Sequence, residues 1–262
     1  MRRLLYILSF FALPASSFSQ DHQELKATVE TMASTFNFQG DTLAGATCFL
    51  VNKDGQQYFV TAAHLFKSSH KSGDTVLVRM LIQNELKPFD ATVYFHANKD
   101  IDIAVFKLSE KVTQSIKLLE NVSQGHGISL DTTLVGFGMP VFFYGFPLTN
   151  MGTEALGIKF PLVKKAIVSG VVKYNRVEVL VLDGHNNVGF SGGPVVAYDS
   201  NLKKMCTIGV VSGYFSETKN VEYKGDKLSF DENSGILLCY GRQYVEEILA
   251  TIEKPSSMKS KK

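Results

Sequence analysis

A serine set among glycines is the residue of this 262-residue chain whose surroundings most favour covalent chemistry. Ser191 lies in the segment Gly189-Phe190-Ser191-Gly192-Gly193-Pro194. A serine hydroxyl is a weak nucleophile, so it needs a base to take its proton and donors to stabilise the resulting oxyanion. Glycines allow a tight turn that points backbone N–H groups inward and lets a substrate carbonyl approach. The segment therefore predicts a catalytic nucleophile, and a glycine-rich hairpin turn with an incidental serine is the alternative.

The order of the histidines decides between two hydrolase arrangements. The pattern G-x-S-x-G also describes the nucleophile elbow of α/β-hydrolases, in which the catalytic histidine follows the serine and a helix follows the elbow. Here all six histidines precede Ser191 (positions 22, 64, 70, 96, 126 and 185), and Gly192-Gly193-Pro194-Val195-Val196 predicts a strand. The elbow interpretation therefore fails on two counts.

Two residues upstream could serve as the base and its acidic partner. His64 ends Val60-Thr61-Ala62-Ala63-His64, a predicted strand whose last small residues leave the imidazole room. Asp102 lies in an apolar run, Asp102-Ile103-Ala104-Val105. A buried carboxylate needs a charged or hydrogen-bonding partner. Taken singly, His64 could be structural, and Asp102 could close a surface turn together with Asp100.

Taken together, these segments resemble the chymotrypsin-like (trypsin-fold) serine peptidases, and most closely the bacterial members without activation cleavage. The match rests on Thr61-Ala62-Ala63-His64, on Asp102-Ile103-Ala104-Val105 and on the segment around Ser191, spaced by 38 and 89 residues. Weaker matches are Phe142–Pro147 and Ile208–Gly213. The resemblance spans about residues 44–241.

The resemblance implies a role for each residue. Ser191 attacks the scissile carbonyl, His64 takes its proton and returns it to the leaving amine, and Asp102 orients the imidazole. The backbone N–H groups of Gly189 and Ser191 form the oxyanion hole, and no cofactor or metal is required. Asp100, two residues from Asp102, stays open as the alternative acid.

The resemblance also predicts the substrate-binding residues. His185 matches the base of the primary specificity pocket, and Ser212, Gly213 and Tyr214 match the segment that pairs with an extended substrate backbone. The digestive members carry an aspartate immediately before the serine, which pairs with a newly cut N-terminus. Phe190 occupies that place here and cannot form an ion pair, so we expect an active site that assembles without activation cleavage.

The fold expected is all-β, with two six-stranded antiparallel β-barrels and a C-terminal helix. Many short segments rich in Val, Ile, Phe and Tyr, without alternating helices, support a sandwich or barrel. The predicted strands include 47–51, 57–61, 75–82, 103–108, 140–144, 165–172, 177–182, 194–197, 207–211 and 236–240. Asn52-Lys53-Asp54-Gly55 predicts a hairpin turn. Helical periodicity is limited to residues 23–32 and 243–252. The expected domains are a signal peptide (1–19), a barrel carrying His64 and Asp102 (20–125), and a barrel carrying Ser191 followed by the terminal helix and a disordered tail (126–262).

The N-terminus resembles an export signal. Arg2 and Arg3 precede a ten-residue apolar run, and Ser17-Phe18-Ser19 fits a signal-peptidase site. The run is too short to span a membrane, so we expect an exported protein, periplasmic or secreted, without stable membrane insertion. A net charge of +2 gives no case for nucleic-acid binding. The residues after Gly241 suffice only for one helix and a tail, so we expect no PDZ-type module.

The partners expected are protein or peptide substrates. The three cysteines, Cys48, Cys206 and Cys239, leave two outcomes open, a Cys206–Cys239 disulfide or three free thiols, and show no metal-site spacing. The alternative function is a catalytically inactive trypsin-fold module that binds or scaffolds a protein. A third interpretation, an unrelated β-sandwich with coincidental motifs, predicts that His64, Asp102 and Ser191 lie far apart.

Overall fold

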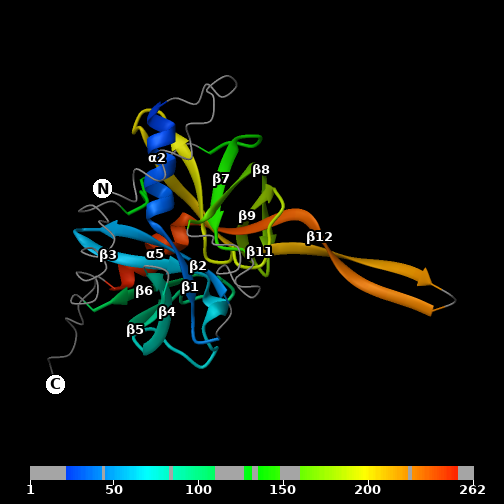
Figure 1. The fold of residues 1–262 in the computed structure, drawn as a ribbon, viewed down its shortest axis with the longest axis horizontal. Coiled ribbons are helices and arrows are strands. Elements are labelled where there is room, and N and C mark those ends of the chain that lie inside the picture. The colour runs from blue at the N-terminus through cyan, green and yellow to red at the C-terminus, as the bar shows by residue number, and fades with distance from the viewer. Residues whose placement is uncertain are drawn as a thin grey trace.

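Two closed antiparallel barrels of six strands form the molecule, and the predicted fold class is confirmed (Figure 1). The computed structural model describes residues 22–42, 45–82, 85–109, 127–131, 135–147, 160–223 and 226–252. The predicted signal peptide, the C-terminal tail and the domain boundaries at 19–20 and 125–126 lie outside these ranges, so they remain predictions.

The first barrel closes in the order β1-β2-β3-β6-β5-β4. Its strands are β1 (Thr35–Gln39), β2 (Gly45–Lys53), β3 (Gln56–Thr61), β4 (Thr75–Ile82), β5 (Glu85–Phe95) and β6 (Ala104–Leu108). Burial alternates along β4, as a strand with one face in the core requires. The predicted β2–β3 turn is confirmed: Asp54 and Gly55 have φ values of 48° and 76°, in the region that a tight hairpin turn needs.

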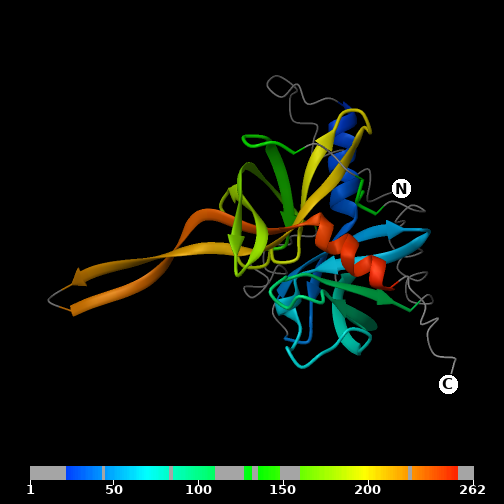
Figure 2. The same cartoon turned by 180° about the vertical axis from the view of Figure 1, so that it is seen from behind.

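The second barrel closes in the order β10-β11-β12-β9-β8-β7. Its strands are β7 (Pro140–Gly145), β8 (Leu162–Tyr174), β9 (Val177–Asp183), β10 (Pro194–Asp199), β11 (Lys204–Tyr223) and β12 (Asp226–Gly241). The far halves of β11 and β12 leave the barrel as a long two-stranded arm (Figures 1 and 2). The arm pairs regularly from Ser216↔Asn233 out to Tyr223↔Asp226.

Each barrel has its own apolar core, and a third cluster joins them. The first core holds Phe38, Phe59 and Phe106, whose rings stack at centroid distances of 5.1–5.2 Å. The joining cluster includes residues of both barrels, such as Val60 and Val210. Because apolar surface from both barrels is buried in one cluster, the barrels are held at a fixed mutual position.

Among the described residues, two α-helices pack on this pair of barrels, at the two places where helical periodicity predicts them. Helix α2 (His22–Ala33) contacts β1 and β11, and helix α5 (Arg242–Ile252) contacts strands of both barrels. Val245, Ile248 and Leu249 form the buried face of α5. The C-terminal helix therefore also fastens the barrels together.

Candidate active site

His64 and Asp102 come from the first barrel and are bound to each other. His64 lies in the short 3-10 helix η1 (Ala63–Leu65), directly after β3, and Asp102 lies two residues before β6. Because β3 pairs with β6, the two strands bring these residues together. The His64 Nδ1 atom lies 2.7 Å from Asp102 Oδ2, and the His64 main-chain N–H donates to Asp102 Oδ1 at 2.8 Å. A carboxylate can only accept, so Nδ1 carries the proton and Nε2 is left free to accept one.

Asp102 has a third donor, from the second barrel. The Ser212 hydroxyl donates to Asp102 Oδ2 at 2.5 Å. Ser212 is the extra residue of a β-bulge, because the β11–β12 register passes from Val211↔Cys239 directly to Gly213↔Leu238. A bulge re-aims a side chain out of the ladder, and here it turns the hydroxyl toward the carboxylate of the other barrel. The sequence placed Ser212 among substrate-binding residues and gave no signal for this contact.

Asp100 makes different contacts from Asp102. Its N–H donates to the Asn98 side chain at 3.1 Å, and its carbonyl accepts the Tyr240 hydroxyl at 2.8 Å. The residue is exposed. Of the two aspartates, Asp102 is therefore the one that contacts His64.

Ser191 lies between β9 and β10, where two turns follow one another. The first turn covers residues 187–190, closed by the Phe190 N–H to the Asn187 carbonyl at 3.2 Å, and the second covers 190–193, closed by the Gly193 N–H to the Phe190 carbonyl at 2.8 Å. The third residue of each turn is a glycine, Gly189 in the first and Gly192 in the second, with φ values of 103° and 82°. A positive φ at the third position is typical of a type II turn, which explains the two glycines around the serine.

The backbone N–H groups of Gly189 and Ser191 have no hydrogen-bond acceptor among the described residues. The Ser191 hydroxyl donates to the Ser212 carbonyl at 3.1 Å. Both N–H groups are thus available to a substrate oxygen. Ser191 binds the Ser212 carbonyl, the Ser212 hydroxyl binds Asp102, and Asp102 binds His64. All four residues therefore belong to one site at the junction of the barrels.

Phe190 is fully buried in the core of the second barrel, against Phe143 at a ring-centroid distance of 5.1 Å. Beside it, the Lys164 ammonium lies 5.2 Å from the centre of the Phe190 ring, donates to the His185 carbonyl at 2.8 Å and also binds the Asn187 side chain. Burial lowers the pKa of Lys164. Apolar packing and one partly exposed cation therefore hold the segment that leads into Ser191. The sequence singled out Phe190 but not Lys164.

The remaining predicted substrate-binding residues are His185, Gly213 and Tyr214. His185 is exposed, and its carbonyl is bound by Lys164. Gly213 and Tyr214 follow Ser212 on β11, and Tyr214 is 39% exposed. The structure thus leaves the side chains of His185 and Tyr214 accessible, and the role of all three residues in binding substrate remains a prediction.

The pKa of His64 is raised above its ordinary value. Burial lowers it, but the hydrogen bond to Asp102 and the negative charge of that carboxylate together raise it by more. The imidazolium form is therefore stabilised, as a base that must hold a proton during the reaction requires.

The three cysteines are not part of this site. Cys48, Cys206 and Cys239 are all free and buried, so the second of the two predicted outcomes is the observed one. The described residues contain no cluster of His, Cys, Asp and Glu suited to a metal ion. Within the same residues, no helix has the length and apolarity to cross a bilayer.

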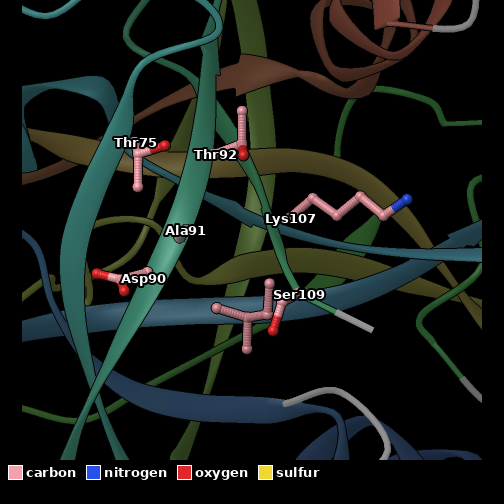
Figure 3. A pocket seen from close by; sticks show the side chains of 7 residues that line it. Thr75, Asp90, Ala91, Thr92, Lys107 and Ser109 are labelled. Carbon is pink, nitrogen blue, oxygen red and sulfur yellow. The ribbon is translucent and has the colours of Figure 1, made fainter. Parts of the chain in front are cut away.

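A separate hollow of about 400 Å³ lies on the first barrel, over β4, β5 and β6 (Figure 3). Its lining residues include Thr75, Asp90, Thr92 and Lys107. None of the predicted site residues lines it. The hollow is therefore separate from the chemistry around Ser191.

Comparison with protein families gives a match over the part of the chain that contains this site. The family of trypsin-like peptidase domains matches residues 46–202, which include His64, Asp102 and Ser191. The chain belongs to the trypsin-like peptidase family. A comparison with curated proteins found no match.

Solved structures of trypsin-like peptidases share the fold. The inactive form of the Rv3671c protease, from M. tuberculosis H37Rv, has a TM-score of 0.55 at 18% identity over 92% of this chain and 100% of that chain. A serine endoprotease from Yersinia pestis has a TM-score of 0.55 at 17% identity, covering 92% of this chain and 67% of the other. The HtrA-type protease AlgW with a tripeptide has a TM-score of 0.56 at 16% identity, covering 87% and 62%. At these identities the likeness shows the fold.

Proposed function

We propose that this trypsin-like peptidase is an exported serine endopeptidase that hydrolyses peptide bonds through an acyl-enzyme. Ser191 is the nucleophile, His64 the general base and then the general acid, and Asp102 the residue that orients the imidazole. The N–H groups of Gly189 and Ser191 stabilise the oxyanion. Protein or peptide substrates bind along Ser212–Tyr214, with His185 near the primary specificity pocket.

The observation that carries this proposal is the bonding of Asp102 to His64. Two of its three hydrogen bonds fix the imidazole and its backbone, and the third, from Ser212, ties the acid to the barrel that carries Ser191. An aspartate that only closed a surface turn would not need hydrogen bonds to the ring and backbone of His64 and to Ser212. To start the reaction, the Ser191 hydroxyl gives up its hydrogen bond to the Ser212 carbonyl and donates its proton to His64 Nε2.

The first prediction concerns covalent labelling of the serine. A fluorophosphonate probe should label the wild-type mature protein at Ser191, because the hydroxyl is activated by His64 and the adduct oxygen is held by the oxyanion donors. Ser191→Ala should abolish labelling and His64→Ala should reduce it at least about 100-fold. Mass spectrometry of the labelled peptide checks the site.

A suitable control is Ser229→Ala, which removes an exposed arm serine bound to Asn220. This variant should be labelled as fast as the wild type. Labelling of Ser191→Ala at the wild-type rate, or no labelling of folded wild type, contradicts the proposal; the second result would favour the inactive binding module.

A second prediction follows from the raised pKa of His64. The base works only when it is neutral, so kcat/KM should be constant at high pH and fall as the pH drops through the His64 pKa. Because that pKa is raised, the midpoint of the acidic limb should lie above the usual value of about 6.5. A pH–rate profile measures it, with circular dichroism at each pH to show that the fold persists; a midpoint below about 6 would contradict the assignment.

A further inference from the structure

Thr47 is a fully buried residue of β2 that joins the first barrel to the turns around Ser191. Its hydroxyl donates to the Gly189 carbonyl at 2.7 Å, and its main-chain N–H donates to the Ser191 carbonyl at 2.9 Å. One residue therefore binds the carbonyls of both residues whose N–H groups form the predicted oxyanion hole.

The Thr47 hydroxyl is itself held in one orientation. It accepts the N–H of Phe146, which follows β7, at 3.0 Å. The Thr47 carbonyl accepts the hydroxyl of Thr61, in β3, at 2.7 Å. A threonine hydroxyl has one proton to donate, and with Phe146 fixed as its donor, that proton is directed at the Gly189 carbonyl.

The Gly189 carbonyl belongs to the peptide that follows the central peptide of the first turn, so its hydrogen bond to Thr47 fixes the end of that turn. Types I and II of a β-turn differ by a rotation of the central peptide, which here joins Val188 to Gly189. The φ of 103° at Gly189 corresponds to type II. In a type I turn the central peptide is reversed, and the Gly189 N–H points to the opposite face of the turn. The direction of one oxyanion donor therefore depends on the state of this turn.

Both ends of the turn are fastened. At its start, Lys164 binds the Asn187 side chain and the His185 carbonyl. At its third residue, the Thr47 hydroxyl binds the Gly189 carbonyl. A side chain at Gly189 would meet the Phe146 carbonyl at 2.2 Å, so the turn is also closely packed against the residue that follows β7. The Lys164 contacts reach the turn from solvent, whereas the Thr47 contact is entirely enclosed.

We infer that Thr47 is a positioning residue for the oxyanion hole, acting through its hydroxyl on the Gly189 carbonyl. It touches neither the substrate nor the reacting atoms. Its effect is to keep the Gly189 N–H directed at the developing oxyanion, so its loss should weaken binding of the transition state more than binding of the substrate. This inference rests on the proposed peptidase function and extends it to a residue outside the triad.

The test compares Thr47→Val, Thr47→Ser and a matched control. Valine has the shape of threonine but lacks the hydroxyl, and serine restores it. The control is Thr207→Val, because Thr207 is equally buried and its hydroxyl has no partner among the described residues. Peptide hydrolysis gives kcat and KM, and inhibition by a peptide aldehyde, whose adduct oxygen occupies the oxyanion hole, gives Ki.

We expect Thr47→Val to lower kcat about 10- to 100-fold with KM changed less than about 3-fold, somewhat less than the loss caused by deleting an oxyanion donor outright. The aldehyde Ki should rise by the same factor as kcat falls, and Thr47→Ser should recover most of both. Thr207→Val should match the wild type. All rates are taken below the melting temperature of each variant; if Thr47→Val does not fold, Thr47→Ala replaces it in the comparison with Thr47→Ser.

Distinct results overturn the two proposals. The positioning role is overturned if the wild type is active and folded Thr47→Val has unchanged kcat and Ki. It is also overturned if Thr47→Ser is as impaired as Thr47→Val. A parallel loss in Thr207→Val overturns it too, because it would show that any change in the buried core has the same effect. Inactive, folded wild type that forms no aldehyde or fluorophosphonate adduct overturns the peptidase function itself.

Discussion

Asp102→Asn should lower kcat about 10⁴-fold, which is the size of the loss when the triad aspartate of a trypsin-fold peptidase is replaced. Asparagine can present its NH₂ group to His64 Nδ1, and the imidazole then carries its proton on Nε2. With Nε2 protonated, His64 cannot accept the proton of Ser191. Steady-state hydrolysis of a peptide substrate measures the effect, and it should be seen in kcat rather than in KM.

Asp100→Asn is the matched control, because it makes the same chemical change two residues away. Asp100 uses its main-chain N–H and carbonyl in the contacts described, and both survive the substitution. Its activity should stay within about 3-fold of wild type, the range usual for exposed substitutions. Equal losses in the two variants, or a larger loss in Asp100→Asn, would contradict the assignment of Asp102 as the acid.

The second large effect is expected from Gly192→Ala, directly after the nucleophile. Gly192 has a φ of 82°, and an added Cβ would lie 2.2 Å from both the Thr47 carbonyl and the Thr61 hydroxyl oxygen. Backbone atoms of the first barrel cannot move away cheaply, so the turn holding Ser191 must shift. We expect loss of fluorophosphonate labelling by at least about 10³-fold, since a displacement near 1 Å can already cost about 100-fold, together with a lower melting temperature.

Gly73→Ala separates backbone strain from the clash. Gly73 has a φ of 96°, but nothing lies within 4 Å of an added Cβ. This variant should lose stability by only about 1 kcal/mol, the usual cost of placing a side chain at positive φ, and should keep its labelling rate. If Gly192→Ala behaves like Gly73→Ala, the close packing of the serine turn against Thr47 and Thr61 is not required for activity.

Sequence patterns predict much of this fold, because buried strands are short and bounded by turn residues. Segments such as Thr75–Ile82 coincide with a strand of the structure, and the Asp54-Gly55 turn is where its residue types place it. The exceptions are β1 and β5, which the sequence did not indicate. In β1 the residue types of Thr35–Gln39 do alternate between polar and apolar, although four of the five residues, including Asn37, are buried. This alternation is a strand signal that could have indicated β1.

The arm formed by β11 and β12 was not predicted either. The sequence indicates only their inner parts, Thr207–Val211 and Ile236–Tyr240, because the outer parts are exposed on both faces and rich in charged residues. In the site, residue types and chain order single out His64, Asp102 and Ser191. Thr47, Lys164 and the Ser212 hydroxyl have no such signal, because their importance lies in hydrogen bonds with residues 14 to 144 positions away.

The three free cysteines have a consequence for how opening of each barrel can be observed. Cys48 belongs to the core of the first barrel and Cys239 to that of the second, and burial raises the pKa of both thiols. An exposed thiolate is the nucleophile that attacks an alkylating reagent, so the folded molecule protects both positions. The rate at which each cysteine is alkylated therefore measures how often its own barrel opens, and no reporter group has to be introduced.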